Sequence, residues 1–406
     1  MAPHKNDEAV FAGPGATEAH RGSVLLSTRL PLFGAKRGPG CGGRWLLVGP
    51  LSWICSDHAD LVVDEPSVRQ PRPEASDGLP YRYYFVGPEG ASGYTDLSRV
   101  EGDAPDGDLE PHFAVAVVEE RVFRDERWLR TRSGYWIASH ELFAAHPSTF
   151  QGEHLAAPAL PVSAPPPPPP PAPGASPPPP GAPPGVGVAW VRTDRTSAYA
   201  EPRAGKPIDT HVRLDRLPWR EERAGVGGPW ARVSEDGAPA RWMRVKDLFH
   251  PSPATVPAEV TGEHERWIDV ELASETLVAY EGPVPVFATV VSTGQGPPGS
   301  DLATPPGVHR IWVKLLSTNM DNLEKDEDER HFSIEDVPYV QFFDKAVALH
   351  GAFWHNDFGR PVSHGCVNLA PRDARWLFAF TSPHVPAGWS AVMPVRFEKG
   401  TVIRVR

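Results

Sequence analysis

The chain is predicted to be a mainly β protein made of several small units, on three features of its sequence. Strand-like segments bounded by tryptophan recur along it, runs rich in β-branched residues dominate its last third, and a proline tract separates the two regions. Its 406 residues include 49 prolines, too many for a chain that folds throughout. We therefore expect about two to four compact units joined by linker.

The tryptophan segments form a weak internal repeat. Residues 45–61, 128–142 and 230–248 each read as strand, turn, strand and a short acidic close ending in leucine. The two tryptophans of each copy are expected to face one small core from paired strands. These pairs are Trp45 with Trp53, Trp128 with Trp136, and Trp230 with Trp242.

This pattern resembles bacterial Src-homology-3-like modules. The resemblance implies three small β-barrel-like modules, at residues 21–66, 67–150 and 188–256, behind an N-terminal tail at residues 1–20. Modules of this kind often bind peptidoglycan peptides. The same tryptophans also serve packing in a barrel of this size, so the repeat supports a wall-associated role without assigning a ligand.

The segment at residues 151–187 is predicted to be a linker. It contains proline runs at residues 165–171 and 177–180, broken by Ala, Gly and Ser. Such a composition lacks core-forming side chains and favours extended polyproline II. A semi-rigid spacer is expected.

From about residue 260 the pattern becomes that of an antiparallel β domain. Alternating or β-branched runs predict strands at residues 267–272, 276–280, 284–292, 307–314, 340–349 and 401–405. Residues 316–337 are polar and acidic, which predicts a solvated loop or lid.

Charge and hydropathy exclude some classes of function. The formal net charge is −11 and the sequence pI is about 5.8, so a nucleic-acid partner is not expected. No apolar run reaches the roughly 18 residues of a membrane span. Residues 45–55 resemble a signal peptide ending at Cys55, but Trp53 and Ile54 stand where small residues are needed, so a core strand is expected. No export signal is visible, and secretion is inferred from function.

The three cysteines are Cys41, Cys55 and Cys366. In an oxidising compartment two of them would pair, and Cys41 and Cys55 lie close in sequence within one small unit. They are expected to be bridged if their Cα atoms lie within roughly 7 Å. Cys366 stands alone, as either a buried apolar side chain or a reactive thiol.

Residues 349–378 contain the candidate chemistry, because histidines gather there around Cys366. A thiol becomes a useful nucleophile when a nearby base takes its proton. His350 ends a predicted strand 16 positions before Cys366, which leaves enough chain for a loop to return. Gly365 lets the backbone approach a substrate carbonyl, and N–H groups around Gly365 and Cys366 are natural oxyanion donors.

A helix is predicted directly after this loop. Pro371 suits a first helical turn, and Trp376, Leu377 and Phe380 fall on one helical face. Cys366 is therefore expected just ahead of a helix start, where the helix dipole favours a thiolate.

Four ordered sequence blocks resemble those of the L,D-transpeptidase catalytic domain family, also called YkuD-like. They are V-S-T-G at residues 291–294, T-P-P-G-V-H at 304–309, A-L-H-G at 348–351 and S-H-G-C-V-N at 363–368. The resemblance covers residues 264–406. It implies that residues 260–406 form a catalytic β-sandwich with a short helix after the cysteine.

The resemblance also implies roles for single residues. Cys366 would be the acylated nucleophile and His350 its general base. The residues that orient the pair and form the oxyanion hole would be Ser363, His364, Gly365 and Asn368. Those on the substrate side would be Tyr339, Gly351, Trp354 and His355. Many members carry Arg where this chain has Asn368, which leaves anchoring of the substrate carboxylate open.

The implied reaction is peptidoglycan acyl transfer without a cofactor. A Cys thioester would form with a tetrapeptide stem and release D-Ala, and the acyl group would pass to an amine of a second stem, or of a lipoprotein or other protein acceptor. Water as acceptor would make the enzyme an L,D-carboxypeptidase or wall hydrolase. The implied location is the periplasm or cell envelope.

Two readings of other classes remain. His350, His355, His364 and Cys366 are all potential zinc ligands, although no H-E-x-x-H or H-x-H arrangement accompanies them, and no metal is expected. The chain could also be a wall-binding adaptor with a silent catalytic domain. Intact Cys366 and His350 argue against that reading.

Overall fold

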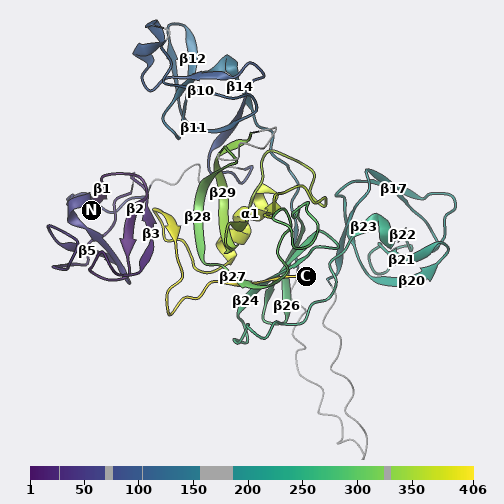
Figure 1. Ribbon diagram of the computed structural model, residues 1–406. Coiled ribbons are helices and arrows are strands. Elements are labelled where there is room, and N and C mark those ends of the chain that lie inside the picture. Colours follow the sequence, from purple (N-terminus) through teal and green to yellow (C-terminus); the bar gives the residue numbers. More distant parts are fainter. Residues whose placement is uncertain (27, 69–75, 103, 156–185, 324–330) are drawn as a thin grey trace, which may run out of the picture. The chain divides into compact units, whose positions relative to one another are not determined.

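The computed structural model describes residues 1–26, 28–68, 76–102, 104–155, 186–323 and 331–406. In these residues most of the regular secondary structure is short strands, and α1 (Pro371–Phe380) is the only α-helix (Figure 1). The prediction of a mainly β protein is confirmed. No helix in the described part of the chain has the length and apolar character needed to cross a membrane.

The chain divides into two compact units. Unit 1 consists of Met1–Thr149, Ile311–Asn356 and Asn368–Gly400, and unit 2 of Phe150–Arg310, Asp357–Val367 and Thr401–Arg406.

The first part of unit 1 is an N-terminal module. Its strands are β1 (Ala2–Pro3), β2 (Glu8–Phe11), β3 (His20–Val24), β4 (Gly34–Lys36), β5 (Trp45–Gly49), β6 (Ser52–Cys55) and β7 (Ala59–Asp60), with a 3₁₀ turn, η1 (Ser56–His58), before β7. The expectation of a tail at residues 1–20 is wrong, because β1 pairs with β7 and Met1 and Val10 are buried. The burial of Met1 and Val10 stabilises this segment in the module. The local sequence pattern did not predict that burial.

The predicted disulfide is present in this module. Cys41 and Cys55 are bonded, with their Cα atoms 5.6 Å apart. Cys55 belongs to β6, so residues 45–55 form a strand hairpin, as expected, and Trp45 pairs with Cys55 across it.

The second module of the structure, residues 81–145, also lies in unit 1. It comprises β8 (Arg82–Val86), β9 (Ala91–Gly93), η2 (Leu97–Gly102), β10 (Gly107–Leu109), β11 (Ala114–Phe123), β12 (Glu126–Thr131), β13 (Trp136–Ala138), η3 (Ser139–Glu141) and β14 (Leu142–Ala144). Trp128 and Trp136 lie on the paired strands β12 and β13 and share one buried cluster with Tyr94. The paired-tryptophan prediction is confirmed for this copy.

The remainder of unit 1 contains β28 (Val313–Asp321), β29 (Ser333–Asp344), β30 (Val347–Gly351), β32 (Trp389–Val392) and α1, together with most of β31 (Val367–Leu369). β28 and β29 form a long antiparallel pair, β32 joins β28 to β3, and β11 meets β29, so one sheet of 15 strands runs through unit 1.

Two expectations are corrected in this region. Much of the acidic segment at 316–337, expected as loop or lid, is strand, because β28 runs to Asp321 and β29 starts at Ser333; residues 324–330 lie outside the described part. The single strand expected at 340–349 is the hairpin of β29 and β30, and Lys345 takes the left-handed backbone that its turn requires.

Unit 2 is built on a sheet of six strands in the order β15-β26-β25-β24-β33-β27. The strands are β15 (Glu153–His154), β24 (Arg266–Glu271), β25 (Thr276–Glu281), β26 (Val284–Val290), β27 (Gly307–Arg310) and β33 (Val402–Val405). The predicted strands at 267–272, 276–280, 284–292 and 401–405 are confirmed. The linker expected at 151–187 starts too early, because β15 pairs with β26; residues 156–185, with both proline runs, lie outside the described part.

The third module, residues 186–250, lies in unit 2 and repeats the plan of the second. Its elements are β16 (Val188–Val191), β17 (Arg195–Ala198), β18 (Asp209–Val212), β19 (Arg216–Pro218), β20 (Glu221–Gly225), β21 (Gly228–Arg232), β22 (Trp242–Arg244), η4 (Val245–Asp247) and β23 (Leu248–Phe249). Tyr199 stands edge-on to Trp230 with ring centroids 5.7 Å apart, as Tyr94 does to Trp128 at 5.8 Å. The shared arrangement explains the sequence echo.

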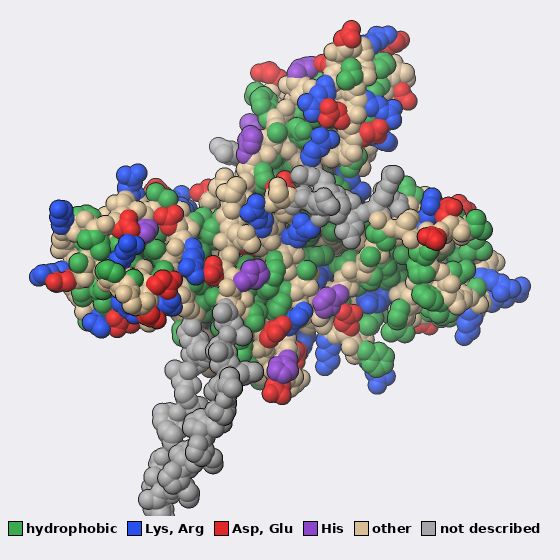
Figure 2. Space-filling model, turned by 180° about the vertical axis from the view of Figure 1, so that it is seen from behind, with side chains coloured by type: hydrophobic (Ala, Val, Ile, Leu, Met, Phe, Trp, Pro, Cys, Tyr) green, Lys and Arg blue, Asp and Glu red, His purple; other side chains and the backbone are tan. Residues whose placement is uncertain are grey.

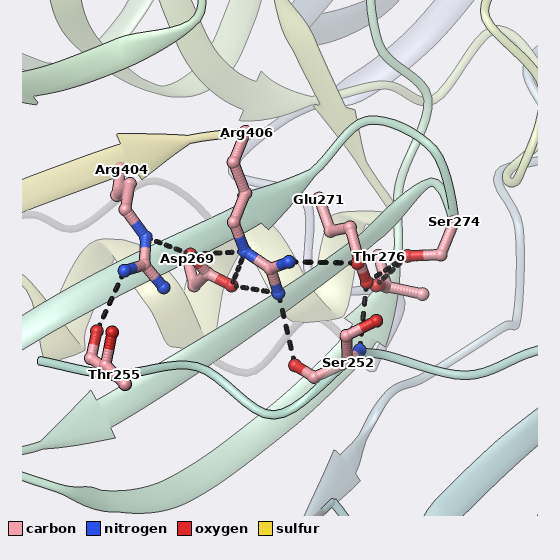
Figure 3. Close-up of polar contacts among 8 residues, drawn as sticks. All are labelled: Ser252, Thr255, Asp269, Glu271, Ser274, Thr276, Arg404 and Arg406. Carbon is pink, nitrogen blue, oxygen red and sulfur yellow. Dashed lines mark hydrogen bonds and ion pairs between the residues drawn. The ribbon is translucent and has the colours of Figure 1, made fainter. Parts of the chain in front are cut away.

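A buried ion cluster fastens the segment after the third module to the sheet (Figure 3). Asp269 is 2% exposed and pairs with Arg404 at 2.7 Å and with Arg406 at 2.9 Å. The two guanidinium groups also donate to the carbonyls of Thr255 and Ser252. A buried carboxylate needs such partners, so the cluster orders this connection as well as β33.

The surface shows mixed charge. On the face drawn in Figure 2, Lys and Arg side chains of the described residues are interspersed with Asp and Glu.

Candidate active site

The loop before Cys366 brings three of the four predicted sequence blocks together within unit 2. Thr304 donates its hydroxyl to Gly365 O at 2.8 Å and accepts the N–H of Gly294 at 2.9 Å. Ser363 forms a parallel bridge with Gly294, and Gln295 N donates to Ser363 O at 3.0 Å. Residues from 291–294, 304–309 and 363–368 therefore form one local structure.

Ser363 organises the turn that contains the thiol. Its hydroxyl donates to Cys366 O and accepts the N–H of Gly365 at 3.2 Å. Gly365 has φ of 116°, a conformation that favours glycine. Cys366 is partly exposed and is the cysteine outside the disulfide. The turn thus presents a thiol whose backbone is held on both sides.

Glu275, which the sequence did not identify as a site residue, stabilises this loop through hydrogen bonds to Thr293. It is 5% exposed and accepts the N–H and the hydroxyl of Thr293 at 2.8 and 2.6 Å. The carbonyl of Thr293 in turn accepts the N–H groups of Val362 and Ser363. Burial raises the pKa of Glu275 against the lowering effect of these hydrogen bonds. An acidic residue in a predicted turn gave no local sign of this role.

The third module also touches the loop. Arg213 donates to Phe358 O at 2.7 Å, and the fully buried Phe358 lies against the ring of Phe150. Gly359 has φ of 90°, and a Cβ there would lie 2.1 Å from the ring of Phe249. Only glycine fits this close approach.

His350 lies in unit 1 near the end of β30 and is 3% exposed. Its Nδ1 is 3.2 Å from Gly351 O, and since a carbonyl can only accept, this contact requires Nδ1–H and leaves the lone pair on Nε2. Burial lowers the pKa of His350 to about 4, with a further lowering from His355 and an opposing effect of the Gly351 hydrogen bond. The imidazole is neutral at physiological pH.

Two of the predicted substrate-side residues gather near His350. Trp354 stacks on the His350 ring at 5.7 Å, and its ring is 6.2 Å from that of His355. His355 Nε2 is 3.0 Å from the amide nitrogen of Asn368, which is 3% exposed. The amide oxygen of Asn368 is buried without a hydrogen-bond partner among the described residues.

The other predicted residues differ in exposure. Tyr339 is buried in β29 with φ of 59°, and its ring lies 5.5 Å from that of Phe378. Gly351 is buried against Pro338 and Ala374. His364, next to the thiol, is exposed.

The helix predicted after Cys366 is present. α1 begins at Pro371, and the short strand β31 precedes it in the chain. β31 pairs with β30, and Ala352 N donates to Leu369 O at 2.9 Å.

Potential metal ligands converge elsewhere. Among the described residues, the group of three His, Cys, Asp or Glu ligand atoms within reach of one ion is Cys41, Cys55 and Asp57. Both of its sulfur atoms belong to the disulfide.

Unit 2 thus contains a partly exposed thiol on a hydrogen-bonded turn, and unit 1 contains a buried imidazole. Residues 265–405 match the family YkuD, described as the L,D-transpeptidase catalytic domain. This part of the chain is therefore an L,D-transpeptidase catalytic domain, which at the level of the family is an acyltransferase. The family resemblance inferred from the four blocks is confirmed.

Solved structures of L,D-transpeptidases are similar to the chain at low identity. The catalytic domain from E. faecium is 22% identical, covers 36% of this chain and 100% of its own, and has a TM-score of 0.27. The Mycobacterium smegmatis enzyme is 18% identical, covers 44% and 90%, and has a TM-score of 0.29. The Xylanimonas cellulosilytica enzyme (residues 123–326) is 19% identical, covers 36% and 62%, and has a TM-score of 0.25.

The chain thus spans less than two thirds of the Xylanimonas cellulosilytica structure. Since these TM-scores lie below 0.5, the assignment of the domain rests on the family match. No curated protein matches the chain.

Proposed function

We propose that the chain is a peptidoglycan L,D-transpeptidase with Cys366 as nucleophile and His350 as general base. The observation that supports it most is the meeting of the 291–294, 304–309 and 363–368 blocks around one partly exposed thiol, inside the span that matches the family.

The first step is acylation. The Cys366 thiol passes its proton to Nε2 of His350 while its sulfur attacks the carbonyl carbon of the third residue of a tetrapeptide stem. The tetrahedral intermediate collapses as the bond to the terminal D-alanine breaks. The D-alanine amine leaves with the proton from His350, and a thioester remains on Cys366.

The low pKa of His350 suits this sequence. A histidine with a pKa of about 4 stays neutral before reaction, so it can accept a proton, and its protonated form is then a strong acid toward the leaving amine. Gly351 O holds Nδ1–H and keeps Nε2 as the basic nitrogen. The imidazole would therefore be neutral in the resting enzyme.

The oxyanion requires backbone donors beside the thiol. In the structure, the N–H of Gly365 is donated to Ser363 Oγ, so we assign an orienting role to Ser363 and Gly365. The buried amide oxygen of Asn368 is an acceptor for a substrate N–H. The proposed substrate side is completed by Tyr339, Gly351, Trp354 and His355. His364, next to the thiol in the chain, is exposed.

The second step decides the product. A stem-peptide amine attacking the thioester gives a 3→3 cross-link, an amine of a lipoprotein or other protein gives anchoring, and water gives carboxypeptidase activity. We propose stem-amine transfer, because the half-buried Trp354 places apolar surface near His350 that disfavours water.

A cell-envelope location follows from this substrate. The Cys41–Cys55 disulfide supports it, because disulfides persist in oxidising compartments. Peptidoglycan stem peptides are then the partner of the catalytic domain.

The test is capture of the thioester. Intact protein mass spectrometry after incubation with a disaccharide-tetrapeptide should show an adduct lacking the terminal D-alanine, mapped to Cys366 and absent in Cys366→Ala. A carbapenem should acylate the same residue.

Adding stem peptide, a lipoprotein fragment or water alone then identifies the acceptor. Dominant hydrolysis with every amine would make the enzyme an L,D-carboxypeptidase, and absence of any adduct would favour a wall-binding adaptor.

A chelator separates the zinc alternative. The cysteine mechanism predicts unchanged adduct formation in excess EDTA. Loss of activity that added zinc restores would overturn it.

A further inference from the structure

A column of aromatic rings in contact joins the second module to His350 within unit 1. Tyr83 of β8 stacks on Phe353 with ring centroids 4.0 Å apart and an interplanar angle of 25°. Phe353 stands edge-on to Trp354 at 5.2 Å, and Trp354 stacks on His350 at 5.7 Å. Each neighbouring pair of rings fixes the orientation of the next, because aromatic contacts have preferred geometries.

The column is part of a single core. Tyr83 and Phe353 are 3% and 1% exposed. They belong to one buried cluster whose other members, Leu79, Tyr81, Ala114 and Ala116, come from the second module and the residues just before it, and against which Trp354 packs. The segment that follows His350 is therefore packed by the second module.

The second module also holds β29, the strand that pairs with β30. Tyr83 donates its hydroxyl to Asp336 O at 2.6 Å, and Arg132 pairs with the Asp336 carboxylate at 3.1 Å. Glu335 accepts the N–H of Ala116 at 2.8 Å and that of Ser133. Both carboxylates are buried, so these contacts are costly to lose.

The backbone held in this way is unusual. Asp336 and Tyr339 in β29 have φ of 52° and 59°, a left-handed conformation that is rare for an aromatic residue. Such conformations persist only where surrounding contacts impose them, and they gather at functional sites. β29 then pairs through Gln341 and Leu349 with β30, one residue before His350.

We infer that the second module is a positioning element of the catalytic domain, and that Tyr83 acts through Phe353 and Trp354 to hold the imidazole of His350. This inference rests on the proposed role of His350. The second module reaches His350 by two routes that both start at Tyr83, the ring column and the hydrogen bond to β29. Tyr83 is a positioning residue, since it acts through other side chains.

The experiment compares Tyr83→Ala, Tyr83→Phe and Phe143→Ala in the full chain. Tyr83→Ala removes both routes, and Tyr83→Phe keeps the ring but removes the hydroxyl. Phe143 is a matched control, since it is an aromatic residue of the second module that is 58% exposed and stands outside the column. Two readouts are taken: the carbapenem acylation rate over pH, and the NMR signal of the His350 ring, which the stacked Trp354 displaces.

Tyr83→Ala is expected to lower the acylation rate about ten- to a hundredfold with little change in the half-saturating carbapenem concentration, and to move the His350 signal. Tyr83→Phe should lower the rate by a few-fold at most, and Phe143→Ala should change neither readout. A folded Tyr83→Ala protein with the wild-type rate and His350 signal would overturn the inference. If Tyr83→Ala does not fold, Phe353→Leu replaces it with the same expected result.

The NMR readout separates this inference from the proposed function. A wild-type protein that forms no acyl adduct while Tyr83→Ala still moves the His350 signal would refute the function and leave the positioning intact. Normal acylation of the wild type, together with an unmoved His350 signal in Tyr83→Ala, would refute the positioning role and leave the proposed function intact.

Discussion

The surroundings of His350 and of Cys366 are built from different interactions. His350 lies in a buried aromatic setting, stacked on Trp354, which contacts Phe353 of the cluster packed by the second module. The Cys366 turn is held by hydrogen bonds from Ser363 and Thr304. The difference fits the two proposed tasks, because a base that must stay neutral benefits from burial, whereas a nucleophile must be reachable and can be fixed through its backbone.

Each setting also has its own accessory module. The second module packs behind His350 in unit 1, and the third module contacts the loop before Cys366 in unit 2 through Arg213 and Phe249. Variants in the second module should therefore alter His350, and variants in the third module should alter the Cys366 loop, each without the other.

The largest effect is expected at the nucleophile itself. Cys366→Ala should reduce adduct formation at least about a thousandfold, because no other group can form the thioester. The fold should be retained, since the side chain is partly exposed and leaves no large cavity. Circular dichroism and the His350 NMR signal check the fold, and a folded variant with undiminished activity would refute the mechanism.

The second effect concerns acid and arises on the His350 side. With its pKa at about 4 in the fold and about 6.5 when unfolded, His350 does not affect the pH dependence of stability above pH 6.5. Between pH 6.5 and 4 the unfolded state binds a proton that the folded state does not, so stability should fall by about 3 kcal/mol as pH decreases. Below pH 4 both states are protonated and this loss stops.

Urea unfolding at pH 7, 5.5 and 4 measures this loss in the wild type and in His350→Gln. The variant should lack this part of the pH dependence. An identical pH profile in the two proteins would show that His350 is not buried as a neutral group. The acylation rate should also persist below pH 6, where an ordinary histidine would already be protonated.

The third effect tests the polar support of Cys366. Glu275→Ala should cost about 2 kcal/mol, because the buried N–H of Thr293 loses its acceptor, and should slow acylation several-fold. Glu275→Gln retains an acceptor and should be milder. Glu281→Gln is the control, since its carboxylate is exposed and pairs with Arg266 at the surface, where an ion pair contributes little.

The His350 NMR signal sharpens this test. Glu275→Ala should leave it unmoved, in contrast to Tyr83→Ala. A displaced signal in both variants would mean that the two sides are not separately supported.

The smallest effect is expected where the third module meets the loop. Arg213→Ala removes the donor to Phe358 O and should cost about 1 kcal/mol, with a change in acylation rate of no more than about threefold. Hydrogen exchange should speed up at the N–H of Gly359, which donates to Val291 O at 2.7 Å. Arg203→Ala, an exposed arginine of the same module paired with Glu201, should leave that exchange unchanged.

The catalytic domain was readable from the sequence because its signals are local. The four blocks, the strands at 267–272, 276–280 and 284–292, and the helix start at Pro371 all depend on short stretches whose residue types specify turn, strand or helix. The Cys41–Cys55 disulfide was predictable for the same reason, since both cysteines lie in one small module.

The errors occur where distant segments meet. Residues 1–20 and 151–155 resemble tail and linker, yet β1 and β15 find strand partners at β7 and β26. The acidic residues at 316–337 predicted loop where the structure has strand. Glu335 and Asp336 can be buried in that strand because they bond groups of the second module, over two hundred positions away.

The sequence by itself therefore determined the family of the C-terminal domain, the thiol and histidine proposed to react, and the repeated tryptophan hairpins. Tertiary structure alone decided that His350 is buried with a lowered pKa, that Glu275 bonds Thr293 beneath the loop before Cys366, and that Tyr83 stacks on Phe353. Burial is the physical reason. The pKa of an imidazole and the role of a carboxylate depend on which distant groups exclude water from them, and that is settled only when the chain has packed.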